Sequence, residues 1–234
     1  MGASTSQINR RERLLESAGR LFSLWGFDKT SMDDVAREAG VSKGAVYLEF
    51  QGKDALFKAV LYREFRRYSE DWLRRFEGDP GEWSFARMFE HSIAAVNANP
   101  LIKALLTRDN RIYGSFLRRN TELLSLVISM RAGLFKRLQE MGALRDDIPA
   151  SVLSYLMTAI SYGMVVAEEV IPAESKVSFE EAIRALGFLL DRGLMPPRAK
   201  SRRAARAFVV AMVEKMQAAL NGGKAPGPEK DGTS

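Results

Sequence analysis

Apolar residues recur at every third or fourth position along most of this 234-residue chain. That spacing places them on one face of an α-helix, whereas a half-buried strand needs apolar residues at every second position. The pattern predicts helices over residues 7–25, 54–78, 83–98, 101–111, 115–142, 149–171, 178–192 and 202–220. Prolines lie at the edges of these segments, namely Pro80, Pro100, Pro149, Pro172, Pro196 and Pro197. Because a proline inside a helix costs about 3 kcal/mol, their placement agrees with an all-α fold.

Between residues 30 and 53 the pattern changes to two short helical segments separated by a glycine. The hydroxyl pair Thr30-Ser31 precedes two acidic residues, as at the start of a helix. Gly40 suits the left-handed position that follows a helix end. Ser42 then begins the second segment as its N-cap. Two short helices joined in this way form a helix-turn-helix, whose second helix is shaped to enter a DNA major groove.

The segment from Leu14 to Leu61 resembles the N-terminal DNA-binding segment of the tetracycline-repressor (TetR) family of transcriptional regulators. The resemblance lies in the sequence AGVSKGAVY, in Gly26-Phe27 at the exit of the first helix, and in the F-x-x-K-[DE] pattern of Phe50 to Asp54. It implies a dimeric regulator that binds an operator in double-stranded DNA and responds to a small-molecule effector.

The segments are expected to group into four parts. A three-helix DNA-binding domain takes residues 1–53, with residues 1–6 disordered, and an effector-binding and dimerisation domain takes residues 54–197. Residues 198–220 add a C-terminal helix that is unusual for the family and is expected to dock on its own subunit. The tail 221–234 is rich in Gly and Pro, so its composition predicts disorder.

The helix-turn-helix predicts two groups of DNA-binding residues. Contacts to backbone phosphates, which fix the register without reading sequence, are expected from Thr30, Ser31, Tyr47 and Lys53. Contacts near base edges are expected from Ser42, Lys43, Gly44 and Ala45. Lys43 can donate to guanine and Ala45 can touch a thymine methyl, while Gly44 lets the backbone come close.

Glu49 departs from the resembled pattern, in which a histidine that touches phosphate often stands at this position. A carboxylate there would repel the DNA backbone. Two interpretations are open: Glu49 pairs with Lys53 four residues later, or it tempers DNA affinity so that a ligand can release the DNA. The pairing is favoured only where the helix continues past Gly52.

The predicted body has material for a mostly apolar effector pocket and for a dimer interface. The candidate ligand-binding residues are Trp72, Phe89, Phe116 and Tyr155, although each is also an ordinary core residue type. The helices predicted at 149–171 and 178–192 have wide apolar faces, which favours an interface with a second copy. A monomer core is the alternative.

Charge and cysteine content change this picture little. The net charge is +6, but residues 1–53 hold eight basic and seven acidic residues, so the excess lies elsewhere, mainly in 192–206. The chain has no cysteine, which suits a reducing cytoplasm. We expect no signal segment and no apolar run that spans a bilayer, and hence no membrane partner.

No catalytic site can be assembled from the sequence, and no metal or cofactor is expected. Gly40 to Gly44 fits the G-x-S-x-G pattern of serine hydrolases, but that motif needs a preceding strand and a histidine base. A helix precedes Ser42 here, and His91 is the chain's single histidine. The helix-turn-helix and the resemblance to the TetR family together predict a ligand-responsive repressor of a palindromic operator. The alternatives are a helical-bundle carrier with no DNA role and an enzyme that uses a cavity in the body.

Overall fold

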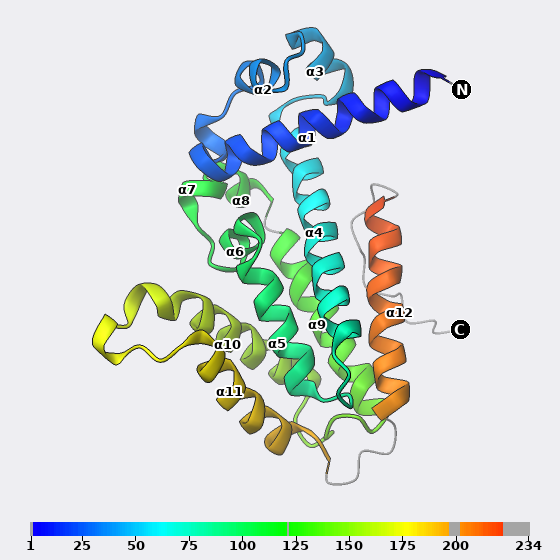
Figure 1. Cartoon of the computed structure of the whole chain (residues 1–234), viewed down its shortest axis with the longest axis vertical. Helices are drawn as coiled ribbons and strands as arrows, with labels where there is room; N and C mark the ends of the chain where they lie inside the picture. The colour runs from blue at the N-terminus through cyan, green and yellow to red at the C-terminus, as the bar shows by residue number, and fades with distance from the viewer. Residues whose placement is uncertain (1, 121, 197–201, 222–234) are drawn as a thin grey trace. The chain divides into compact units, whose positions relative to one another are not determined.

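The computed structural model describes residues 2–120, 122–196 and 202–221, and every regular element within these ranges is helical (Figure 1). The helices are α1 Gly2–Lys29, α2 Met32–Ala39, α3 Lys43–Glu49, α4 Lys53–Gly78, α5 Phe85–Asn97, α6 Pro100–Leu106, α7 Asn110–Tyr113, α8 Ser115–Arg119, α9 Glu122–Glu140, α10 Ala150–Val170, the short 3-10 helix η1 Ala173–Ser175, α11 Phe179–Leu194 and α12 Arg202–Asn221. The all-α prediction is confirmed. The predicted disorder of residues 222–234 lies outside the described residues.

Two of the predicted helices are each divided in the structure, and α1 begins earlier than expected. The segment predicted at 101–111 forms α6 and α7, because Arg108 has a positive φ of 53° and the Asp109 side chain caps α7 by accepting from the Arg111 amide. The segment predicted at 115–142 forms α8 and α9. Helix α1 begins at Gly2, so the prediction that residues 1–6 are disordered is wrong for residues 2–6.

The chain divides into two compact units. One consists of Met1–Arg67 with Asn99–Thr121, and the other of Tyr68–Ala98 with Glu122–Ser234. The first unit therefore holds α1, α2, α3, α6, α7, α8 and the first part of α4. Helix α4 is continuous from Lys53 to Gly78, so the two units share one helix.

The first unit is built on a cluster of aromatic rings. The Phe57 ring lies 4.6 Å from both Phe22 and Phe116 and 5.4 Å from Tyr113, between ring centroids. Phe27 closes the cluster at 5.1 Å from Phe57. These side chains come from α1, α4, α7 and α8 and are almost completely buried, so their burial is a main source of stability for this unit.

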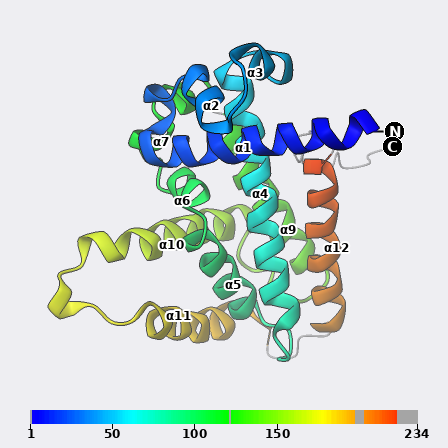
Figure 2. The same ribbon diagram turned by 45° about the horizontal axis from the view of Figure 1, so that its top comes forward.

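Gly26 lets the end of α1 meet α7, and the two helices also lie against one another in Figure 2. Its φ of 82° interrupts the helix before the chain turns again to Lys29. A Cβ added at Gly26 would stand 1.9 Å from the Arg111 carbonyl oxygen. Only glycine fits such a conformation and such a close approach. The sequence correctly placed a helix break at this residue.

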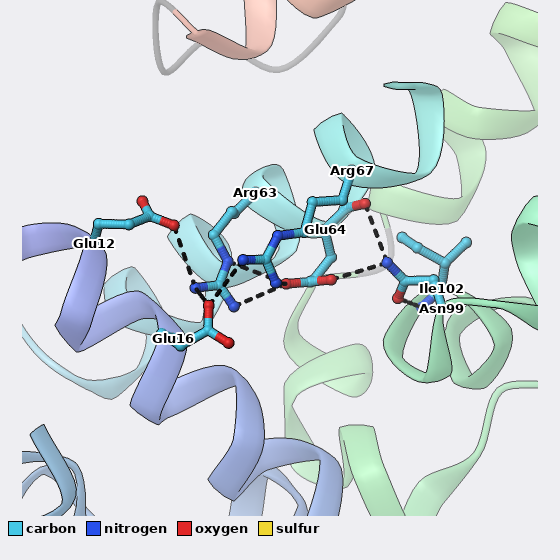
Figure 3. Close-up of polar contacts among 7 residues, drawn as sticks. All are labelled: Glu12, Glu16, Arg63, Glu64, Arg67, Asn99 and Ile102. Atoms are coloured by element: carbon cyan, nitrogen blue, oxygen red, sulfur yellow. Dashed lines mark hydrogen bonds and ion pairs between the residues drawn. The ribbon is translucent and has the colours of Figure 1, made fainter. Parts of the chain in front are cut away.

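A partly buried network of charged side chains ties α1, α4 and α6 together (Figure 3). Arg63 on α4, 5% exposed, donates to Glu64 at 2.9 Å and to Glu16 of α1 at 3.1 Å. Arg67 reaches the same Glu16 oxygen at 2.8 Å. The Asn99 side chain donates to Glu64 at 2.9 Å and accepts from the Ile102 amide at 3.1 Å, capping α6.

The network neutralises its own charges. A buried guanidinium is stable only when carboxylates and hydrogen bonds surround it. The hydrogen bond from Arg67 and the charges of both arginines lower the pKa of the Glu16 carboxyl. Glu12 adds a third carboxylate at 3.6 Å from Arg63. The position of α1 on α4 thus depends on ion pairs that the sequence pattern did not reveal.

The second unit has a separate apolar core. Helix α5 packs on α11, and α9 packs on α10. The core contains Trp72, Phe76, Trp83, Phe85, Phe89, Phe135, Leu138, Leu153 and Met157, with Ala205, Val209 and Val213 from α12. Helices α4 and α5 are also joined by hydrogen bonds, from Trp72 Nε1 to the Met88 carbonyl at 3.2 Å and between Tyr68 and Ser92 at 2.9 Å.

Helix α12 docks on its own subunit, as predicted (Figures 1 and 2). The Arg206 guanidinium lies 4.8 Å from the centre of the Phe76 ring. It also donates to the carbonyls of Phe76, Glu77 and Asp79, at 2.9, 3.2 and 3.4 Å. A cation at the C-terminal end of α4 satisfies carbonyls that have no partner within that helix.

Helix α10 differs from the expectation that no apolar run is long enough to span a bilayer. Within the part of the chain that the structure describes, the stretch Ala150–Ala167 is long and apolar enough to cross a bilayer, by length and composition. Leu153, Met157 and Val165 of this stretch belong to the core. Only 28% of the stretch is buried, however. Its outer face is an exposed apolar surface.

We predict that Glu64→Gln lowers the free energy of unfolding by about 3 kcal/mol, since breaking a buried ion pair leaves an uncompensated charge. Urea unfolding measures this value. Glu12→Gln is the matched control: its side chain is 50% exposed, so its loss should cost less than about 1 kcal/mol. Equal costs for the two variants would contradict the compensating role of Glu64.

Candidate functional site

The start of α2 is fixed by the hydroxyl cap that the sequence predicted. Ser31 Oγ accepts from the Asp34 amide at 3.1 Å, and the Asp34 carboxylate accepts from the Ser31 amide at 3.0 Å. This reciprocal pair is a capping box. Thr30 has a different role. Its side chain is buried, with Thr30 1% exposed, and its hydroxyl donates to the Gly26 carbonyl at 2.8 Å. Ser31 is exposed, so it is the hydroxyl of the pair that remains accessible to DNA.

The turn between α2 and α3 is the one expected of a helix-turn-helix. Gly40 has φ 65° and ψ 39°, in the left-handed region. Its amide and that of Val41 donate back to the carbonyls of Arg37 and Ala36, at 3.2 and 3.0 Å. This is the pattern in which glycine ends a helix and redirects the chain. Ser42 then caps α3 by accepting from the Ala45 amide at 3.2 Å.

Helix α3 presents most of the predicted contact residues to solvent. Ser42, Lys43, Gly44 and Tyr47 are exposed, Ala45 is partly exposed, and Val46 is buried against the rest of the unit. Nothing lies within 4 Å of a Cβ built on Gly44. Leu48, which is 84% exposed, was not among the residues proposed from sequence. An exposed leucine beside the others offers an apolar contact of the kind that thymine methyls make.

Lys43 is held by an acidic residue of α2. Its ammonium lies 2.8 and 3.0 Å from the two Asp33 carboxylate oxygens. The hydrogen bond and the charge of Asp33 raise the pKa of Lys43. Both side chains are more than half exposed, so solvent screens the pair and its strength is small. In the predicted DNA contact, a phosphate or guanine would have to compete with Asp33 for this ammonium group.

Lys53 serves the fold of the unit rather than its outer face. Its ammonium donates to the carbonyls of Phe27 and Asp28, at 2.8 and 3.3 Å, and lies 4.4 Å from the centre of the Phe27 ring. A lysine so placed caps the C-terminal end of α1. Its predicted phosphate contact would have to share the ammonium with these carbonyls.

Glu49 does not pair with Lys53, because α3 ends at Glu49, Phe50 is extended and Gly52 has φ 130°. That interpretation is wrong. The Glu49 carboxylate instead lies 2.8 Å from Arg10 and 3.9 Å from Arg11, both on α1. The Glu49 side chain is only 10% exposed. Its charge is therefore compensated by α1, at the end of a helix where a negative charge is otherwise unfavourable.

The four residues proposed for the effector pocket fall in different environments. Trp72 and Phe89 belong to the core of the second unit. Tyr155 on α10 is 72% exposed. Phe116 belongs to the first unit, where it is buried against Phe27 and Phe57. Of the four, Trp72 and Phe89 are therefore the two that share one apolar environment.

The described geometry defines a helix-turn-helix DNA-binding protein, with two capped helices, a left-handed glycine turn and an exposed second helix. Residues 14–60 match the bacterial regulatory proteins of the tetR family. The chain belongs to the TetR family. The resemblance seen in the sequence is thereby confirmed.

Similarity to characterised relatives extends beyond the matched segment. The HTH-type transcriptional regulator UidR of Escherichia coli K12 is 24% identical over 183 residues, covering 75% of this chain and 90% of UidR. The HTH-type transcriptional regulator AcrR of Shigella flexneri is 36% identical over 73 residues, covering 30% of this chain and 34% of AcrR. Both relatives are HTH-type transcriptional regulators. This chain shares their class.

A solved structure supports the fold over most of the chain. The transcriptional regulator FadR of Bacillus subtilis, in complex with stearoyl-CoA, superimposes with a TM-score of 0.58 at 13% sequence identity. The match covers 78% of this chain and 98% of that protein. At this identity the likeness concerns the fold.

We predict two effects of Glu49→Gln. The free energy of unfolding should fall by about 1 kcal/mol, since a charge-assisted hydrogen bond becomes a neutral one. DNA binding should tighten by less than about 1 kcal/mol with a steeper salt dependence, since Arg10 and Arg11 lose their counter-charge.

Thermal unfolding and DNA titrations across a salt series measure these effects. Glu38→Gln is the control, because Glu38 pairs with Arg20 at 2.7 Å but is 41% exposed. If Glu49→Gln leaves DNA affinity unchanged or weaker, Glu49 does not temper the binding of DNA.

Proposed function

We propose that this TetR-family protein is a ligand-responsive, dimeric repressor that binds a palindromic operator through α3 and leaves it when a small, mostly apolar effector binds. The observation that supports this most is the exposed face of α3, where Lys43, Gly44 and Tyr47 stand on a helix fixed at both ends. A regulator of this kind would act in the cytoplasm on double-stranded DNA.

The proposed reading of DNA follows from the length and the cap of α3. An α-helix is about 10–12 Å across with its side chains, which suits entry into a major groove about 12 Å wide. The seven residues of α3 form about two turns of such a helix. The N-terminal residues of a recognition helix meet base edges, here Lys43, Gly44 and Ala45. Ser31 and Tyr47 would contact phosphates. Lys53 would contact phosphate with the N–H groups that its bonds to the Phe27 and Asp28 carbonyls leave free.

The proposed dimer follows from the outer apolar surface of α10 and α11. Tyr155 is 72% exposed, Leu189 65% and Phe188 59%. An apolar surface on neighbouring helices of this kind is usually covered by a partner. A second copy would provide that cover. It would also bring two copies of α3 to two half-sites, as a palindromic operator requires.

The proposed response to an effector uses α4. Its last residues, from Tyr68, belong to the second unit and its first residues belong to the first. Arg63 and Arg67 tie those first residues to α1 through Glu16. An effector that favours one position of α4 would therefore favour one position of α1 and the helices packed on it. FadR was solved with stearoyl-CoA, a ligand that carries a long apolar chain, which supports an effector with a large apolar part.

Two substitutions in α3 test the DNA-binding proposal. Lys43→Ala should relax the preference at one base pair of each half-site by roughly ten- to a hundred-fold. Tyr47→Ala should weaken binding to all sequences by about 1–2 kcal/mol, as expected for a lost phosphate contact. Gel shifts with the DNA upstream of the chain's own gene, and with single-base variants of it, distinguish the two effects.

Lys58→Ala is the matched control, since Lys58 is exposed on α4 rather than on α3. Operator affinities that match the unaltered protein in both α3 variants would refute this placement of the recognition helix. Absence of binding to any DNA would favour the alternative function, a helical-bundle carrier.

We predict that Tyr155→Glu with Leu189→Glu gives monomers, because a buried charge without a partner is costly. Leu186, although on α11, packs against the core and is unsuitable for this test. Sedimentation measures the state of association. Leu24→Glu replaces a leucine of α1 that is 75% exposed and should leave the dimer intact. A double variant that still sediments as a dimer would place the interface elsewhere.

A further inference from the structure

An arginine stands among neutral polar groups in the second unit. Arg131 on α9 is partly buried, and its guanidinium donates to Thr158 Oγ1 of α10 at 3.0 Å. No other described side chain bonds to it, and no described carboxylate lies within ion-pair distance of it. Several other arginines of α9 and α4 are paired with an acid, for example Arg137 with Glu140 at 2.8 Å. Arg131 is thus a cation without a counter-ion among the described residues.

The groups around Arg131 are polar and held in place. Thr158 donates its own proton to the Ser154 carbonyl at 2.8 Å, so its remaining lone pair is directed to Arg131. On the neighbouring helices the Tyr68 hydroxyl pairs with the Ser92 hydroxyl at 2.9 Å. Burial raises the pKa of Tyr68, and the Ser92 hydrogen bond and the positive charge of Arg131 oppose that rise. Tyr68 also packs against the core of the second unit, which contains Phe135, one turn from Arg131 on α9.

This arrangement is costly in the free protein. Burial lowers the pKa of the Arg131 guanidinium, yet an arginine stays protonated in proteins. A desolvated cation that is not paired destabilises the fold. A guanidinium has five N–H donors, and one of them has a partner here. The remaining donors form a planar fork of the kind that binds carboxylate and phosphate.

An apolar environment adjoins these polar groups. Trp72 follows Tyr68 by one turn of α4, and Phe135 follows Arg131 by one turn of α9. Phe89 precedes Ser92 by about one turn of α5. All three rings belong to the core of the second unit. The polar groups and the apolar rings thus occupy successive turns of the same helices, an arrangement that suits a ligand with one charged end.

We propose that Arg131, with Tyr68, Ser92 and Thr158, binds the anionic end of the effector, and that the effector is an amphipathic molecule with an oxyanion, such as a carboxylate, on an apolar chain or ring. This inference rests on the proposed function and names the chemistry of its ligand. Tyr68 directly follows Arg67, whose guanidinium holds Glu16 of α1. Ligand binding at Tyr68 therefore acts on the residue next to that ion pair.

The test compares fatty-acid anions with their uncharged alcohols. Octanoate, dodecanoate and hexadecanoate, and the three matching alcohols, are titrated into the full-length protein by calorimetry. The unaltered protein should bind at least one anion roughly ten- to a hundred-fold more tightly than its alcohol, the range expected of charge-assisted hydrogen bonds. Arg131→Met should abolish that preference and leave binding of the alcohols unchanged. Arg131→Lys should retain part of it, and Tyr68→Phe should reduce it.

The melting temperature without ligand provides a second measurement. Replacing an arginine with a structural role would lower it, whereas replacing an unpaired arginine should not. Because the unpaired charge is removed, Arg131→Met should melt at the same temperature as the unaltered protein or higher in the absence of ligand. Arg137→Met is the matched control on the same helix, with a side chain that is 59% exposed, and should keep the preference for anions. The inference is overturned if the unaltered protein prefers none of the anions, or if Arg131→Met keeps the preference.

Gel shifts separate this inference from the proposed function. The Arg131→Met variant should bind the operator like the unaltered protein and should no longer be released by the preferred anion. If the unaltered protein binds no DNA but prefers an anion through Arg131, the site stands and the repressor proposal fails. If DNA is bound and released by neutral compounds alone, the repressor proposal stands and the anion site fails.

Discussion

The burial of the Arg63 guanidinium is the condition on which the first unit is assembled. Arg63 is 5% exposed, and a charge so far from water needs carboxylates around it. Glu64 provides one from the same helix, and Glu12 and Glu16 approach from α1. Gly19 leaves room for the guanidinium, because a Cβ there would come within 2.6 Å of Arg63 Nη2. Charge compensation therefore fixes α1 on α4 together with the aromatic core.

The same network relates the fold to the proposed regulation. Glu64 is bound by Asn99, the residue that caps α6, and Arg67 connects α4 to α1 one residue before the helix passes into the second unit. A shift of α4 must either carry α1 with it or separate paired, partly buried charges. Since the second choice is costly, α4 is suited to transmit a change from the proposed effector site. In the proposed anion site, Arg131 is the corresponding group, a charge without a counter-ion among the described residues.

Much of the helix-turn-helix could be predicted from the sequence because its determinants are local. The Ser31 and Ser42 caps and the left-handed Gly40 each involve residues no more than five positions apart. Local signals were also present where the prediction failed: Asp109 is a typical N-cap residue, but the apolar spacing across 101–111 concealed the break at Arg108. The α3 residues proposed for DNA contact are mostly exposed, and the exposed Leu48 is not among them.

The sequence by itself determined the helical class, the family and the residues of α3 that face outward, because spacing, caps and turn glycines act over one or two turns of chain. The tertiary structure alone decided which partners charged and aromatic residues have. Arg10 meets Glu49 across 39 positions, Lys53 turns to the end of α1, and Phe116 joins the rings of the first unit instead of Trp72 and Phe89. Such contacts depend on how helices pack, and residues far apart in the chain carry no local pattern that reveals them.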